Sequence, residues 1–229
     1  MSINQTPFRE TISALESIPL SLESTFLYSI NSDQTWVSDA IVLLQSLQNQ
    51  IPNQKISLVA DGGGSGGKVY RVGDNAFKIS KITPFIFVDH RELLASELSQ
   101  LLVLSKACSN ITDTEITGKV KTPRIKGGFI YNHDGEVVCG VVMEFIDNAK
   151  QFSEIESELK KSGENEKLKY LVRYRSELLA ALKAQIYRLG LREIDAGPQN
   201  TLVQLTQDGK IENQPVLWFI DPSSEDMKS

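Results

Sequence analysis

The stretch that decides the fold is GGGSGGKV, at residues 62–69. Residues 56–60 before it and residues 69–72 after it are rich in apolar and β-branched side chains, which is typical of strands. A third segment of this kind, at residues 76–79, follows the turn Gly73-Asp74-Asn75. The sequence therefore predicts three antiparallel strands, with a glycine-rich loop in the first connection.

The rest of the chain mixes helical and strand patterns. Apolar residues recur at helical spacing within residues 1–54, 89–107 and 168–189, and the last of these helices is expected to stop at Gly190. A charged helical face with a break near Gly163 is predicted for residues 154–169. Strands are predicted at 125–132 and 137–145, joined by a turn at 133–135, and shorter ones at 201–203 and 217–220. These patterns predict an α+β protein.

Composition narrows the classes of function. The net charge is −5 and the basic residues are dispersed, which argues against nucleic-acid binding. No apolar run is long enough for a membrane helix, so a soluble protein is expected. Cys108 and Cys139 lack metal-site spacing and are expected to be buried thiols. The Ser- and Thr-rich residues 1–25 fit either a bacterial secretion leader or a polar helical cap on the next domain.

Glycine loops of several kinds can bind phosphate, and the context separates them. A P-loop needs a Ser or Thr after Gly67-Lys68 and then a helix, but Val69 has no hydroxyl and a strand is predicted there. A Rossmann fingerprint also opens a helix, so the same objection applies. Two interpretations remain: a plain flexible turn, or a strand–loop–strand hairpin whose backbone N–H groups cover nucleotide phosphates.

An ordered series of motifs extends the second interpretation over residues 55–222. The motifs are Gly-x-Gly-x-x-Gly-x-Val at Gly62, Gly64, Gly67 and Val69, Ala-x-Lys ending at Lys78, an apolar strand at residues 141–145, and Asp195 five residues before Asn200. An apolar strand that ends in Asp221 follows. Through this series the chain resembles the protein-kinase-like superfamily, and in its compactness the minimal effector kinases that bacterial pathogens inject into host cells.

The resemblance implies a site for ATP and Mg²⁺. Lys78 would pair the α- and β-phosphates and would be positioned by Glu97, or as a second choice by Glu92. Asp195 would orient the acceptor hydroxyl and take its proton, while Asn200 and Asp221 would bind the metal. The residues implied for nucleotide binding are Gly62, Gly63, Gly64, Ser65, Gly66, Gly67, Val69, Lys78, Met143, Glu144 and Ile146.

Departures from the family pattern concern regulation and the acceptor. Glu193 and Ile194 replace the His and Arg of the catalytic loop, and Pro222 and Ser223 replace the residues after the metal-binding Asp. The sequence ends soon after Asp221 without an activation segment or a helical platform for a peptide. The acceptor surface is therefore expected from a partner, from residues 1–54, or from chain beyond residue 229.

These inferences predict a two-lobed, kinase-like fold. It would comprise an N-terminal helical region (1–54), a small lobe with an antiparallel sheet (55–147) and a truncated helical second lobe (148–229). The expected function is transfer of phosphate from ATP to a protein Ser or Thr, in the cytoplasm or in a host cell, and the resemblance also implies an activating host factor. Two alternatives stay open: a small-molecule kinase of the aminoglycoside or fructosamine type, suggested by Asp221-Pro222, and a nucleotide-binding pseudokinase.

Overall fold

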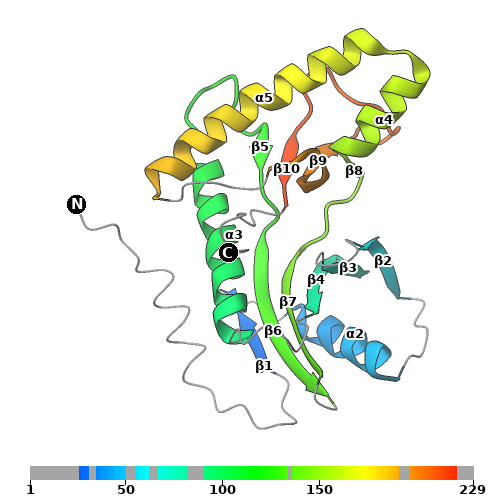
Figure 1. Ribbon diagram of the computed structural model, residues 1–229, viewed down its shortest axis with the longest axis vertical. Helices are drawn as coiled ribbons and strands as arrows, with labels where there is room; N and C mark the ends of the chain where they lie inside the picture. Colours follow the sequence, from blue (N-terminus) through cyan, green and yellow to red (C-terminus); the bar gives the residue numbers. More distant parts are fainter. Residues whose placement is uncertain are drawn as a thin grey trace. The chain divides into compact units, whose positions relative to one another are not determined.

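The fold is α+β and divides into two compact units (Figure 1). The computed structural model describes residues 26–30, 35–49, 55–61, 67–81, 90–133, 136–190 and 196–220. The first unit comprises Met1–Ser99 and Arg124–Phe145, and the second comprises Gln100–Pro123 and Ile146–Ser229. The α+β class predicted from the sequence is confirmed.

A six-stranded antiparallel sheet forms the first unit, in the order β1-β6-β7-β4-β3-β2. Its strands are β1 (Phe26–Ser29), β2 (Ile56–Asp61), β3 (Lys68–Val72), β4 (Asn75–Lys81), β6 (Ile125–His133) and β7 (Glu136–Glu144). Gly73, in the turn between β3 and β4, has a φ of 59°, a conformation that glycine adopts without strain. The three strands predicted around the glycine loop and the two predicted around residue 134 are confirmed.

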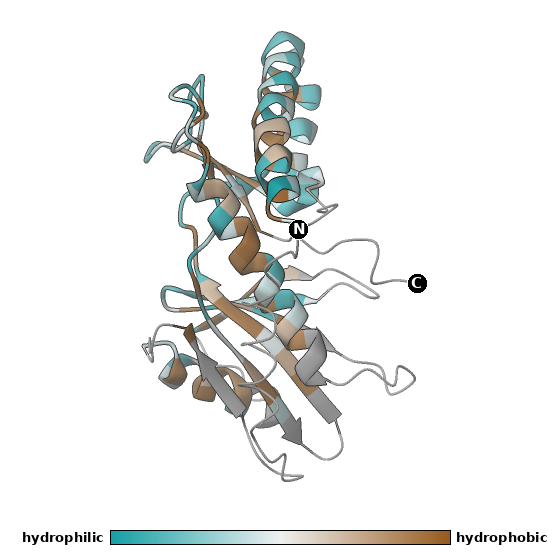
Figure 2. Cartoon of the chain, turned by 90° about the vertical axis from the view of Figure 1, so that its left-hand side faces the viewer, coloured by the Kyte–Doolittle hydropathy of each residue, from teal (hydrophilic) through white to brown (hydrophobic). Residues whose placement is uncertain are grey.

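Helices cover both faces of this sheet. Trp36 and the first turns of α2 (Val37–Asn49) pack against a cluster that includes Phe77 and Phe129. In contrast, α3 (His90–Ser109) packs at Gly128 through Leu94. A Cβ added to Gly128 would lie 2.8 Å from the Cδ1 of Leu94. Successive strand residues point to opposite faces, so positions 128 and 129 face different helices. Hydrophobic residues are accordingly concentrated on the central strands (Figure 2).

The prediction of helix throughout residues 1–54 is wrong at β1. Phe26–Ser29 is a strand that pairs with β6, with Phe26 opposite Ile130. A four-residue strand is too short to display an alternating pattern, and its state is set by the neighbouring strand. The helix predicted near residues 36–47 is present as α2, and its buried residues belong to the core of the first unit. The helix predicted around Phe8 lies outside the described residues.

A buried polar chain ties α2 to the sheet. Lys126 is 6% exposed and donates a hydrogen bond to the Oδ1 of Asn75, which is 4% exposed. The Nδ2 of Asn75 donates in turn to Asp39 of α2, at 2.7 Å. Because buried polar groups are costly when unpaired, this chain fixes the position of α2 on its face of the sheet.

The second unit is built on a four-stranded sheet in the order β5-β10-β9-β8. Its elements are β5 (Val120–Lys121), β8 (Ala149–Gln151), α4 (Phe152–Ser162), α5 (Asn165–Arg188), the 3₁₀ helix η2 (Pro198–Asn200), β9 (Thr201–Gln204) and β10 (Leu217–Phe219). The break at Gly163 and the stop near Gly190 are confirmed, since both glycines have positive φ after a helix end. The short strands β5 and β8 were not predicted.

The core of the second unit joins one side of each helix to one face of the sheet. Leu171, Leu178 and Leu182 of α5 are buried with Val203 and Phe219 of the strands. In β9 and β10, buried and half-buried residues alternate, as expected for a sheet that is covered on one face. Among the described residues, no helix has both the length and the apolar character needed to cross a membrane.

Gly140 of β7 is expected to tolerate no side chain. A Cβ there would lie 2.6 Å from the Cζ of buried Phe129 and 2.8 Å from the backbone oxygen of Lys78. We expect Gly140→Ala to lower the free energy of unfolding by about 1–3 kcal/mol, measured by denaturant titration. Gly128→Ala should cost less, because its shortest contact, at 2.8 Å, is with the end of the Leu94 side chain, and the backbone oxygen of Gly140 is farther, at 3.1 Å. Equal stability of wild type and Gly140→Ala would contradict this account.

Candidate active site

Lys78 and Glu97 form an ion pair in the first unit. The Nζ of Lys78, on β4, lies 2.8 Å from the Oε1 of Glu97, on α3, and the two side chains are 16% and 15% exposed. This Oε1 has no well-directed hydrogen bond among the described residues, so charge attraction holds the pair. Because both groups are largely shielded from water, their attraction is stronger than that of a surface pair. The structure thus brings together two residues that the sequence predicted to act together.

The charges of Lys78 and Glu97 affect the pKa of the Cys139 thiol. Burial raises the pKa of the Cys139 thiol to about 12, and the negative charge of Glu97 also raises it, whereas Lys78 lowers it. Burial likewise raises the pKa of Cys108 to about 12. Both thiols are therefore neutral near pH 7, and neither is an activated nucleophile. The expectation of a buried thiol holds for Cys139, whereas Cys108 is half-buried.

Small and apolar side chains surround Lys78 on its face of the sheet. Val69 of β3 is directly opposite Lys78, and Ala76 of β4 is directly opposite Met143 of β7. Directly opposed residues of antiparallel strands share a face, and so do residues two apart on one strand. Val69, Ala76, Lys78 and Met143 therefore form one continuous patch. Sequence reasoning did not count Ala76 as a site residue, although it is part of the motif that ends at Lys78.

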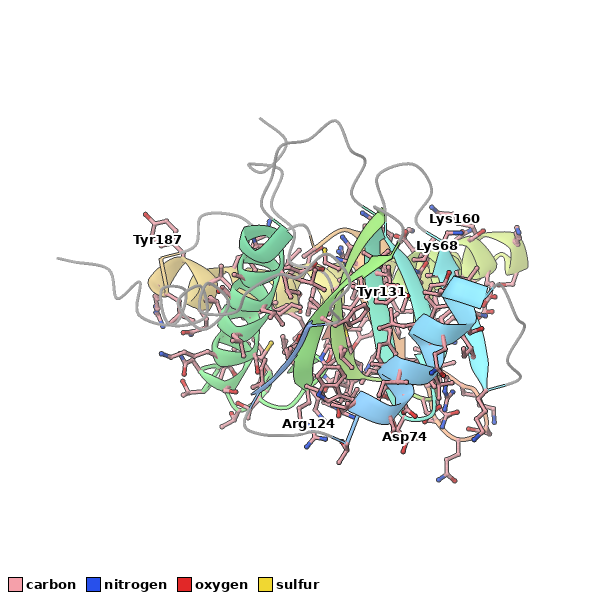
Figure 3. The ribbon with its side chains drawn as sticks, turned by 90° about the horizontal axis from the view of Figure 1, so that it is seen from below. Lys68, Asp74, Arg124, Tyr131, Lys160 and Tyr187 are labelled. Atoms are coloured by element: carbon pink, nitrogen blue, oxygen red, sulfur yellow. The ribbon has the colours of Figure 1, made fainter. Side chains whose placement is uncertain are left out.

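Backbone hydrogen bonds fix the end of β7. The N–H of Glu144 donates to the carbonyl oxygen of Arg124 at 2.9 Å, and the N–H of Arg124 donates to the Glu144 carboxylate at 2.9 Å. The N–H of Phe145 donates to the carbonyl oxygen of Asp74 at 3.0 Å. Arg124 and Asp74 are labelled at the same end of the sheet in Figure 3. The N–H groups of both Glu144 and Phe145 are therefore engaged within the first unit.

The division between the units falls directly after this segment, between Phe145 and Ile146. The guanidinium of Arg71 lies 4.0 Å from the centre of the Phe145 ring, a cation–π contact within the first unit. Of the residues implied for nucleotide binding, Met143 and Glu144 therefore belong to the first unit, whereas Ile146 belongs to the second.

In the second unit, strand pairing positions Asn200. Phe219 of β10 is opposite Thr201 of β9, and the N–H of Ile220 donates to the carbonyl oxygen of Asn200 at 3.1 Å. The N–H of Asn200 donates to the carbonyl oxygen of Gly197 at 3.0 Å, across the 3₁₀ turn η2. This register brings Asn200 against the residue that directly precedes Asp221 in the chain.

Arg175 of α5 holds the segment that carries Asn200, and sequence reasoning missed it. Its Nη2 donates to the carbonyl oxygen of Ala196, and its Nε donates to the Oγ1 of Thr201 at 3.2 Å. The Thr201 hydroxyl in turn donates to the carbonyl oxygen of Gly197 at 3.1 Å. A signal was present in the sequence, because Arg175 interrupts the apolar stripe of α5 between positions 171 and 178.

Several predicted site residues lie outside the described residues. These are Gly62, Gly63, Gly64, Ser65, Gly66, Asp195 and Asp221. Glu92 is in α3, but its side chain is also outside the description. Gly67, at the end of the glycine loop, is described and leads directly into β3. Among the described residues, no group of three or more His, Cys, Asp and Glu side chains could hold a metal ion.

A pocket of about 390 Å³ lies in the second unit, and none of the predicted site residues is among those that line it. It is lined by parts of α4, the start of α5 and the loop after β9, and two of its lining residues are Lys167 and Lys210. Lys167 pairs with Glu164 at 3.7 Å and Lys210 pairs with Asp208 at 2.6 Å. Because these charges are already balanced, the pocket offers no argument for an anionic ligand.

No protein-family model matches this chain, and no curated protein matches it.

Proposed function

We propose that this protein is an ATP- and Mg²⁺-dependent phosphotransferase of the protein-kinase type, acting most simply on a protein Ser or Thr. The observation that carries the proposal is the shielded ion pair between Lys78 and Glu97. In protein kinases, a lysine on a strand of the small lobe binds the phosphates of ATP, and a glutamate of the following helix holds this lysine in place. In this chain the two residues occupy those motif positions.

The patch beside Lys78 suits the rest of the nucleotide. Val69, Ala76 and Met143 offer an apolar surface for a planar base. The glycine loop, whose end at Gly67 leads into β3, would cover the phosphates with backbone N–H groups.

The donor atoms of Asn200 and Asp221 fit magnesium. Amide and carboxylate oxygens are the hard ligands that Mg²⁺ prefers, together with phosphate oxygens of the nucleotide. The pairing of β9 with β10 supports their joint action, because Ile220 contacts Asn200 and directly precedes Asp221. Bound Mg²⁺ would neutralise the charge of the phosphates during transfer.

Catalysis would consist mainly of positioning and charge neutralisation. Asp195 would accept the proton of the acceptor hydroxyl as its oxygen bonds to the γ-phosphorus, and the bond from that phosphorus to the β-γ bridging oxygen would break to release ADP. Lys78 would hold the α- and β-phosphates in place, and Glu97 would keep the lysine there through their ion pair. The products would be a phosphate ester and ADP.

A labelling assay tests the proposal. The protein is incubated with ATP labelled at the γ-phosphate, first with host and bacterial lysates and then with aminoglycosides and sugars. Label in a protein band, lost in Lys78→Met but kept in Lys169→Met, is the expected result. Lys169 is the matched control because it also pairs with a glutamate, Glu166, at 2.8 Å but is 73% exposed.

Other outcomes would replace the proposal with a defined alternative. Label in a small molecule would favour the small-molecule kinase that Ile220-Asp221-Pro222 also resembles. Stabilisation by ATP without any transfer would favour a pseudokinase. Transfer of label from α-labelled ATP, with none from γ-labelled ATP, would indicate AMP transfer. A protein that neither binds ATP nor transfers label would overturn the proposal.

A further inference from the structure

Arg175 forms hydrogen bonds with both ends of a short segment, residues 196–201, in the second unit. Its guanidinium donates one hydrogen bond to Ala196 and another to Thr201, so the five residues after Ala196 are spanned by a single side chain. Thr201 is fully buried, and its hydroxyl donates a further hydrogen bond to the carbonyl oxygen of Gly197. Asn200 lies within this segment, and Ala196 directly follows Asp195 in the chain.

We infer that Arg175 is a positioning residue, which holds residues 196–201 so that Asn200 presents its side chain to Mg²⁺. The inference rests on the proposed function, because it assigns Arg175 a role in the same site. Three hydrogen bonds fix the backbone around Asn200: its N–H to Gly197, Ile220 to its carbonyl, and Thr201 to Gly197. The Arg175 contacts join this arrangement to α5, the longest helix of the second unit.

The cost of desolvating the half-buried charge of Arg175 argues that this residue does more than fill space. Burial lowers the pKa of its guanidinium, and the negative charge of Glu156 opposes that shift. An arginine remains charged in a protein, so desolvation must be offset by its hydrogen bonds and by the Phe152 ring, whose centre lies 5.3 Å away. An apolar residue at this position of the α5 stripe would avoid the cost but could not fix the two ends of the segment.

Two substitutions and a matched control test the positioning role. Arg175→Met keeps the apolar stem and removes all donors, whereas Arg175→Lys keeps the charge but cannot reproduce the two-ended fork. Arg173→Met is the control, because Arg173 lies on the same helix but is 72% exposed, with Glu177 3.7 Å away. Thr201→Val provides a second test with Arg175 intact, should Arg175→Met fail to fold.

Hydrogen exchange measures the anchoring without any catalysis. We expect the amides of Asn200 and Ile220 to exchange faster in Arg175→Met than in wild type, because the segment loses its link to α5. Amides of β6 and β7, in the first unit, should be unchanged, as should all amides in Arg173→Met. Unchanged exchange at Asn200 and Ile220 in both Arg175→Met and Thr201→Val would overturn the anchoring.

Kinetics measure the consequence for the site. We expect kcat to fall roughly 10- to 100-fold in Arg175→Met, as for other residues that orient metal ligands, with a higher Mg²⁺ concentration for half-maximal rate. The KM for ATP should stay close to that of wild type, and Arg175→Lys should recover only part of the rate. A kcat and Mg²⁺ dependence equal to wild type would overturn the positioning role. Absence of transfer by wild type would instead contradict the proposed function, and the exchange result would still decide the anchoring.

Discussion

Replacing Lys78 with methionine is expected to lower the rate of phosphoryl transfer roughly 10²- to 10³-fold, because the charged group proposed to bind the phosphates is lost. Methionine keeps a similar stem, so the apolar contacts beside Val69 remain. Glu97, which is only 15% exposed, would lose its partner, and the folded protein would also be less stable. The initial rate at saturating ATP, together with the midpoint of thermal unfolding, separates the two effects.

Glu97→Gln tests the same pair from the other side. The change keeps the size of the side chain and removes its charge, so Lys78 stays but is no longer held. We expect a smaller loss of rate than in Lys78→Met. The matched controls are Lys169→Met and Glu166→Gln, because that pair is also 2.8 Å apart but is 73% and 88% exposed. Wild-type rates in both Lys78→Met and Glu97→Gln would contradict the assignment of the pair.

Replacing Asp221 with asparagine is expected to lower transfer at least roughly 10²-fold, because the proposed charged ligand for Mg²⁺ is lost. Asn200→Ala should have a smaller effect, since a neutral amide contributes less to binding a divalent cation. In both variants the rate should rise further with Mg²⁺ at concentrations that already saturate wild type. Initial rates over a titration of Mg²⁺ at constant free ATP measure this shift.

The control for these variants is Asp208→Asn, on the loop after β9 in the same unit. Asp208 is on the surface, where hydrogen bonds from Lys210 and Thr206 lower its pKa. Its replacement should leave the rate and the Mg²⁺ dependence unchanged. An Asp221→Asn protein with full activity would exclude Asp221 as a metal ligand.

Elements with a clear period were predictable from the sequence. The strands around the glycine loop, α3 and α5 show their spacing within one segment, and each lies close to its predicted bounds. In contrast, α4 was predicted only as a charged face, and it buries Phe152, Ile155 and Leu159. By contrast, β1, β5 and β8 have four, two and three residues. Segments this short carry no readable period, because pairing with a distant strand determines their state.

The candidate site was predictable where a motif fixes the residue types. Lys78 and Glu97 were paired from the order of motifs, and the structure places their charged atoms 2.8 Å apart. Arg175 was missed because its role depends on Ala196 and Thr201, which only the folded chain brings to α5. The engagement of the Glu144 N–H with Arg124 likewise depends on the register of β6 and β7.

The parallel pairing of β5 with β10 affects how the chain can fold during its synthesis. Val120 is opposite Leu217, so the second sheet cannot be completed until Leu217 has left the ribosome. All strands of the first sheet are available once Glu144 has emerged. The pairing of β5 with β10 closes the long loop between Val120 and Leu217, which is entropically costly and slow. The sheet that carries Lys78 can therefore form well before the pairing of β9 with β10 that holds Asn200.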